Sequence, residues 1–153
     1  MSRNKKKKIP KPSQNKKTGK ISEAALQLRS LSRNDDKHPC FRFTYADKNR
    51  WQLSSWTASE IDDLIKGLKK IERYTWGQIR NHGSKTRGQS VGTGYKLITN
   101  HPNLPDDCPE DIKLSEMRID EKKRIFGFRD AEIYYIIWFD RGHSARPENK
   151  TRK

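Results

Sequence analysis

Apolar side chains alternate with polar ones over residues 41–45. Alternation with a period of two is typical of a half-buried strand. Residues 47–49 have turn chemistry, and residues 51–53 are a candidate for the partner strand of a hairpin. We therefore expect the folded part of the chain to begin at Cys40.

Two helices are predicted after this strand. Thr57 and Glu60 have the spacing of a capping box, in which each residue bonds to the backbone N–H of the other. Apolar side chains then recur at helical spacing and form one stripe at Ile61, Leu64, Ile65, Leu68 and Ile71. The same capping-box spacing at Thr75 and Gln78 predicts a second, shorter helix that runs to about Asn81.

Four further strands are predicted towards the C-terminal end. They are expected over about residues 95–99, 115–119, 124–129 and 132–140. The last three should be antiparallel neighbours, since short turns connect them, with the tight connection of the last pair at 130–131.

The run 133–139 is apolar at every position. Strict alternation places Tyr134, Ile136 and Trp138 on one face, and Tyr135, Ile137 and Phe139 on the other. A strand that is apolar on both faces is expected in the centre of a sheet, with helices on one side and more chain on the other. The predicted fold class is α+β, with a small antiparallel sheet covered on one face by a helix and a short second helix.

Positive charge is concentrated at the two ends of the chain. The 153 residues carry a formal charge of +15. Residues 1–20 contain nine basic residues and no acidic ones, and residues 144–153 contribute +3, which leaves about +3 for the segment between them. We expect a basic, largely disordered arm over 1–39 with a candidate short helix at 21–31, a domain over 40–143, and a basic disordered tail over 144–153.

This distribution of charge leaves three roles open for the ends of the chain. They could bind nucleic-acid phosphates, touch an anionic membrane surface or act only as solubilising tails. The chain has no signal-peptide pattern and no apolar run long enough to span a bilayer, so we expect a cytoplasmic protein with no membrane partner. Cys40 and Cys108 are expected to be reduced, and no metal site or cofactor is predicted.

The final strands carry arginines at defined places. Arg118 ends one predicted strand, Arg124 begins the next, and the apolar run 133–139 precedes His143. This arrangement resembles the RelE/ParE superfamily, the toxins of bacterial toxin–antitoxin modules. The resemblance implies a RelE-like fold over 40–143, RNA or the ribosome as target and a small antitoxin protein as partner. The chain departs from the family pattern at Ser144, where an arginine is usual.

The resemblance implies metal-free RNA cleavage, in which a neighbouring 2′-hydroxyl attacks the phosphate. Such a reaction needs cations to stabilise the phosphate and a group that transfers protons. His143, Arg124 and Arg118 are the candidate catalytic residues. Other readings of these residues are an exposed histidine at a strand end and a cross-strand pair between arginines and nearby carboxylates.

Further residues are candidates for contacts with nucleic acid. They are Lys123, Arg129, Lys85, Arg87, Lys96 and Tyr134. Lys85 and Arg87 lie in a glycine-rich loop, and Tyr134, or alternatively Tyr95, would stack on a base if it were exposed at the rim. Two other functions stay open: a non-catalytic nucleic-acid-binding protein of phage or plasmid type, and a ParE-like inhibitor directed at a topoisomerase.

Overall fold

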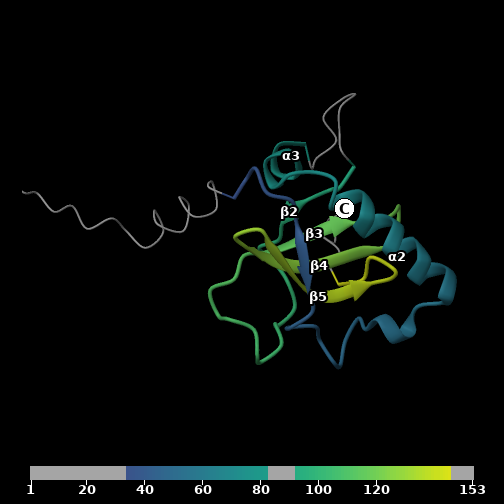
Figure 1. Ribbon diagram of the computed structural model, residues 1–153. Coiled ribbons are helices and arrows are strands. Elements are labelled where there is room, and N and C mark those ends of the chain that lie inside the picture. Colours follow the sequence, from purple (N-terminus) through teal and green to yellow (C-terminus); the bar gives the residue numbers. More distant parts are fainter. Residues whose placement is uncertain (1–33, 83–91, 146–153) are drawn as a thin grey trace, which may run out of the picture.

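The computed structural model describes residues 34–82 and 92–145 (Figure 1). Its elements are β1 (Cys40–Arg42), the 3-10 turn η1 (Leu53–Ser55), α2 (Ala58–Ile71), α3 (Trp76–His82), β2 (Lys96–Leu97), β3 (Leu114–Arg118), β4 (Arg124–Asp130) and β5 (Ile133–Asp140). The candidate helix at 21–31 and most of both predicted tails lie outside the described residues. The fold is α+β, as predicted, and the described residues form two α-helices and a five-stranded sheet.

The strands are arranged in the order β1-β5-β4-β3-β2, so β5 is an inner strand as expected. The pairs from β2 to β5 are antiparallel. In contrast, β1 runs parallel to β5, with Cys40 opposite Ile133. The sheet is thus antiparallel from β2 to β5, as predicted, and the parallel strand β1 at its edge makes it mixed.

The predicted hairpin between β1 and residues 51–53 is also wrong. After β1 the chain continues along the same edge of β5, where the Asp47 N–H donates to the Ile137 carbonyl and the Phe139 N–H donates to the Trp51 carbonyl. These bonds occupy backbone groups of β5 that β1 is too short to reach. Leu53–Ser55 then forms a 3-10 turn instead of a returning strand.

Both predicted capping boxes are present. At the start of α2, Thr57 Oγ1 accepts from the Glu60 N–H at 3.3 Å, and the Glu60 carboxylate accepts from the Thr57 N–H at 2.8 Å. Thr75 and Gln78 form the same reciprocal pair before α3. Each cap satisfies N–H groups that would otherwise lack partners and stabilises its helix by about 1 kcal/mol.

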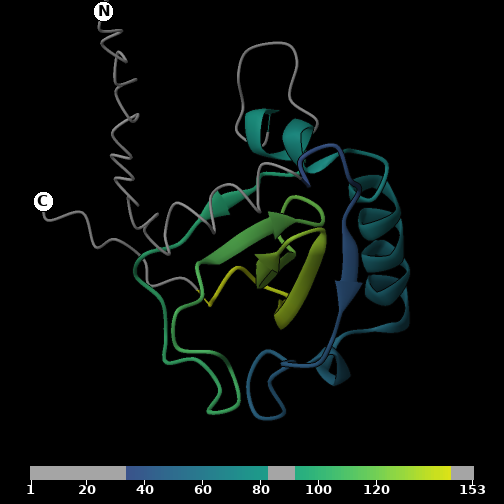
Figure 2. The ribbon, with the colours of Figure 1, turned by 60° about the vertical axis from the view of Figure 1, so that its left-hand side comes forward.

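Two apolar layers cover the sheet. One lies under the helices and contains Leu64, Ile71, Trp76, Ile79, Met117, Ile125, Tyr134, Ile136 and Phe139. The other lies on the opposite face and contains Ile98, Cys108, Leu114, Phe126, Phe128, Ile137 and Trp138. In Figure 2, α2 lies on one side of the strands and the connection between β2 and β3 on the other. The expected cover of helices on one face and irregular chain on the other is thus observed.

A bulge in β5 changes the predicted faces of this strand. Gly127 is opposite Ile136, whereas the preceding Phe126 is opposite Trp138, so Ile137 is an extra residue. Tyr134 and Ile136 face the helices, but Trp138 belongs to the layer on the other face. The predicted alternation is correct before the bulge and inverted after it, because one inserted residue reverses the period of two.

The packed region extends beyond the predicted boundaries of the domain. Asp35 forms ion pairs with Arg80 at 2.6 Å and with Arg129 at 3.0 Å. The Lys37 carbonyl accepts from the Trp76 N–H at 2.9 Å. At the other end of the domain Ala145 is buried in the second apolar layer.

Candidate functional site

The three candidate catalytic residues lie at one end of the sheet. Arg118 ends β3 and Arg124 begins β4, and the two are direct cross-strand partners. Arg124 is in turn opposite Asp140, the last residue of β5, and His143 follows in the next loop. Cross-strand partners point to the same face, so Arg118, Arg124 and Asp140 form a row on the face away from the helices.

Arg124 holds the turn between β3 and β4. Its guanidinium donates from Nη1 to the carbonyls of Asp120, at 2.6 Å, and Lys123, at 3.0 Å. Nη2 donates to the Glu121 carbonyl at 3.2 Å. The residue is only 7% exposed. Burial is the main cause that lowers the pKa of Arg124, and repulsion from Arg118 is the second.

Arg118 has a less satisfied position. Its Nε is buried and has no hydrogen-bond partner among the residues that the structure describes. Gly94, at a φ of +55°, lies against it: a Cβ on this glycine would be 3.2 Å from the Arg118 Cβ and 3.5 Å from its Nε. The site therefore contains two neighbouring guanidiniums, one of which retains an unused buried donor.

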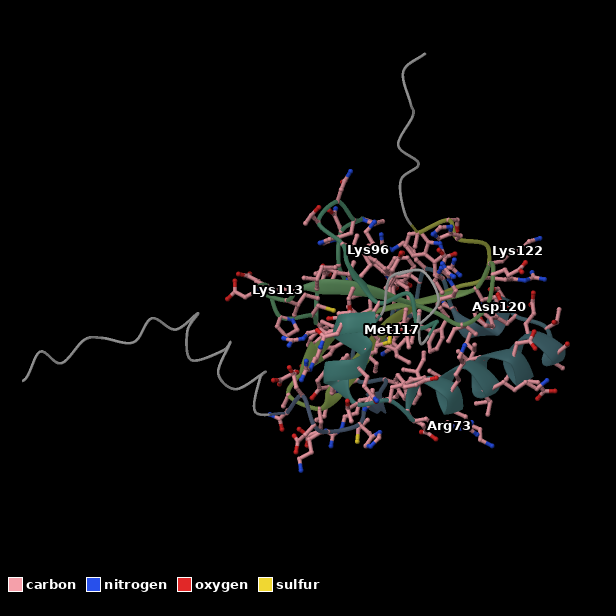
Figure 3. All side chains as sticks on the ribbon, turned by 90° about the horizontal axis from the view of Figure 1, so that it is seen from above. Arg73, Lys96, Lys113, Met117, Asp120 and Lys122 are labelled. Atoms are coloured by element: carbon pink, nitrogen blue, oxygen red, sulfur yellow. The ribbon has the colours of Figure 1, made fainter. Side chains whose placement is uncertain are left out.

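Two carboxylates lie in the same region. Glu116 is buried and attracts Arg124 electrostatically, but less strongly than Arg118 repels it. The exposed Lys96 is opposite Glu116 in the sheet. The row therefore contains three cations, Arg118, Arg124 and Lys96, and two carboxylates, Glu116 and Asp140. Lys96 lies on the side of the sheet away from Met117 and the helices (Figure 3). We call these five residues the strand-end cluster.

Asp140 determines the shape of the loop that carries His143. Its Oδ1 accepts from the Ser144 N–H at 2.9 Å and its Oδ2 from the Ala145 N–H at 2.8 Å. His143 is exposed and has a φ of +59°, in the left-handed region. The Asp140 carboxylate therefore forms the turn after β5, and the imidazole of His143 remains open to solvent.

Three predicted nucleic-acid contacts are instead used inside the fold. The Lys123 ammonium pairs with Asp63, at 3.2 Å, and with Asp120, and its side chain is 12% exposed. Hydrogen bonds and ion pairing with Asp120 raise its pKa. The proposed role of Lys123 is therefore contradicted by its position, since its charge is already matched by two carboxylates.

Arg129 and Tyr134 need the same correction. Arg129 donates to Asp35, at 3.0 Å, and to the Ala131 carbonyl, at 2.7 Å, and its guanidinium lies 4.5 Å from the ring centroid of Trp76. Tyr134 is fully buried and its hydroxyl donates to the Ser115 carbonyl at 3.0 Å. Burial raises its pKa, and the ring has no face on which a base could stack.

Tyr95, the alternative stacking residue, is also largely enclosed. Its ring contacts Trp76 edge-on, with centroids 5.9 Å apart, and burial raises its pKa. Lys96 is exposed, as a contact to nucleic acid requires. Lys85 and Arg87 lie outside the described residues.

The sequence did not indicate that Glu116 and Asp140 would lie on the same face as the arginine pair, or that Gly94 would lie against Arg118. Asp140 reaches the same face as Arg124 only because of the bulge in β5. The available signal was Gly127, an isolated glycine inside a strand pattern, which is typical of a bulge or a close backbone contact. A Cβ on Gly127 would lie 2.0 Å from the Tyr135 carbonyl oxygen, so this position requires glycine.

Comparisons with protein-family models, with curated proteins and with solved structures give no match for this chain.

Within residues 34–82 and 92–145, no three His, Cys, Asp or Glu side chains gather in a way that could hold a metal ion. The helices in these ranges are all too short or too polar to cross a bilayer. Both cysteines are free, and burial raises the pKa of Cys108 to about 11.

Proposed function

We propose that this protein is an endoribonuclease of the RelE-like toxin type, which holds an RNA phosphate at the strand-end cluster. The observation that carries the proposal is the cross-strand pair of Arg118 and Arg124, because their charges repel each other. In addition, the Arg118 Nε lacks an acceptor among the described residues. A phosphate between the two guanidiniums would supply that acceptor and offset the repulsion.

The proposed reaction assigns one role to each residue. The RNA 2′-oxygen forms a bond to phosphorus, the bond from phosphorus to the 5′-oxygen breaks, and the products are a 2′,3′-cyclic phosphate and a 5′-hydroxyl. Arg118 and Arg124 stabilise the negative charge that develops on the phosphate oxygens. His143 gives a proton to the leaving 5′-oxygen, and water accepts the proton of the 2′-hydroxyl.

A second candidate is binding to nucleic acid without cleavage. Two observations favour it: the Arg124 guanidinium already donates to three carbonyls, and Asp140 holds the backbone of the His143 loop by its N–H groups. In this case Arg118 and Lys96 would contact phosphates, and His143 would be only an exposed loop residue.

Incubation of the purified protein with single-stranded RNA in the presence of a chelator separates the two candidates. His143→Ala should cleave RNA about 10²- to 10⁴-fold more slowly than the wild type, with RNA binding unchanged. Arg118→Ala should weaken both binding and cleavage. His101→Ala is the matched control, because its ring bonds to the neighbouring Pro102 carbonyl in the β2–β3 connection.

Three results of this experiment lead to different conclusions. Cleavage that depends on His143 supports the ribonuclease. Binding without cleavage supports the second candidate, and absence of both excludes each of them. A toxin should also stop bacterial growth when it is induced, and a small antitoxin encoded next to it should restore growth.

A further inference from the structure

Two basic side chains rest directly on the backbone of residues 92–94. A Cβ on Gly92 would lie 2.9 Å from the Lys70 Nζ, and a Cβ on Gly94 would lie 3.2 Å from the Arg118 Cβ. Both glycines have a positive φ, +71° and +55°. Lys70 comes from α2 and Arg118 from β3, so this segment joins cations from the two sides of the sheet.

Two buried polar side-chain atoms at this place, one from Thr93 and one from Arg118, lack hydrogen-bond partners among the described residues. Thr93 is 1% exposed, and its Oγ1 has no hydrogen-bond partner within the described ranges. The Arg118 Nε lacks one as well. Within residues 34–82 and 92–145, neither Lys70 nor Arg118 forms an ion pair with a carboxylate.

The segment is held at the edge of the sheet. The Arg118 N–H donates to the Thr93 carbonyl at 2.6 Å, which extends the pairing of β2 with β3 beyond Lys96. Three residues span at most about 7 Å between their first and last Cα atoms. The Lys70 ammonium and the Arg118 side chain therefore lie close to the two ends of a short stretch of backbone, where glycine leaves room for them.

We infer that Lys70, Arg118 and the backbone of residues 92–94 form a second phosphate contact. It directs the nucleic-acid strand from the arginine pair, across the edge of the sheet, towards the C-terminal end of α2. Arg73 marks this end of the helix in Figure 3. The inference rests on the proposed binding of RNA at the strand-end cluster and extends it to the path of the bound strand.

The test is the affinity of the full-length protein for a fluorescein-labelled single-stranded oligoribonucleotide over a series of salt concentrations. Lys70→Ala should weaken binding about fivefold at 0.1 M salt and make the salt dependence shallower by about 0.7 in the log–log slope, as expected for the loss of one phosphate contact to a single strand. Lys69→Ala is the matched control, since Lys69 is exposed on the same turn of α2 but points away by about 100°.

A second measurement locates the contact directly. In ¹⁵N-labelled protein, the amide signals of Gly92 and Gly94 should shift when the oligoribonucleotide is added, whereas that of Gly77, which lies against Asp35, should not. RNA binding that is equally strong in Lys70→Ala and Lys69→Ala, with unshifted signals for Gly92 and Gly94, would overturn the inference and leave the proposed function standing. A wild-type protein that binds no RNA would overturn both.

Discussion

Arg118 and Arg124 are neighbours with the same charge, but the fold uses them differently. Arg124 is bonded to three carbonyls and stabilises the turn between β3 and β4. Arg118 has a buried Nε without an acceptor among the described residues and lies beside a second positive charge. A buried donor that has no acceptor within the described ranges and lies beside a second guanidinium is a good candidate for binding an anion.

This difference predicts opposite effects on stability. Arg124→Met should lower the free energy of unfolding by about 1–3 kcal/mol, because three carbonyls of the turn lose a charged donor. Arg118→Ala should have little effect or raise stability, because it removes the repulsion. Urea denaturation followed by tryptophan fluorescence measures both, with Lys122→Ala as the control for an exposed cation in the same turn. Equal destabilisation by the two arginine substitutions would contradict these roles.

Asp47 is a buried carboxylate that accepts several hydrogen bonds. Its side chain is 4% exposed and accepts from Trp138 Nε1 at 2.9 Å and from the Asn49 N–H at 2.8 Å. Burial by itself would raise the pKa of Asp47, but these hydrogen bonds and the neighbouring Arg50 lower it below 3.8. The carboxylate thus stabilises the fold above its ordinary pKa, and this contribution is lost as the pH falls through the lowered value.

Comparison of Asp47→Asn with the wild type at several pH values tests this assignment. At neutral pH the variant should be less stable, and the difference in free energy of unfolding should shrink as the pH falls below about 4. The measurement is urea denaturation at each pH. A difference that stays constant down to pH 2 would show that the charge of Asp47 has no part in its effect.

At the level of elements, local patterns predicted most of the secondary structure. The capping residues Thr57 and Thr75 gave correct helix starts, and the strands from β3 to β5 lie within two residues of their expected bounds. The errors concern pairing between distant segments. Nothing in residues 40–45 indicates that β1 would run parallel to β5, because that choice depends on the path of the chain through α2 and α3.

The bulge in β5 is the element that creates the strand-end cluster. It turns Trp138 and Asp140 to the face of Arg124, whereas unbroken alternation would turn them towards the helices. Gly127 permits this geometry, since the Tyr135 carbonyl occupies the position of its missing Cβ.

Gly127→Ala should therefore destabilise the protein by about 3 kcal/mol or more, because a clash with backbone cannot be relieved by a side-chain movement. Gly142→Ala is the control, as a Cβ at that position would have no atom within 4 Å. Thermal or urea denaturation distinguishes the two. If Gly127→Ala were as stable as Gly142→Ala, the description of the bulge would be wrong.

At the level of the whole molecule, the sequence predicted where the candidate site lies better than it predicted which residues belong to the site. Arg118 and Arg124 meet as expected, and His143 lies in the loop at the same end of the sheet. Lys123, Arg129 and Tyr134 were misassigned, because a single sequence does not show which cations pair with carboxylates inside the fold or which aromatic ring is fully buried. Each has a partner that is distant in the chain, namely Asp63, Asp35 and Ser115 respectively.

The distribution of charge makes it necessary to test where on the molecule RNA binds. Most of the net charge of +15 belongs to the two ends of the chain, so the full protein could bind RNA without using the strand-end cluster at all. Only a comparison of positions within the domain can separate the two cases.

The most direct test is the affinity of full-length Arg118→Ala and Lys113→Ala for a single-stranded RNA that carries 2′-O-methyl groups and cannot be cleaved. Arg118 ends β3, and the exposed Lys113 immediately precedes its other end. We predict binding about fivefold weaker in Arg118→Ala at 0.1 M salt, and an affinity within twofold of the wild type in Lys113→Ala. Equal affinities in the two variants would contradict the account.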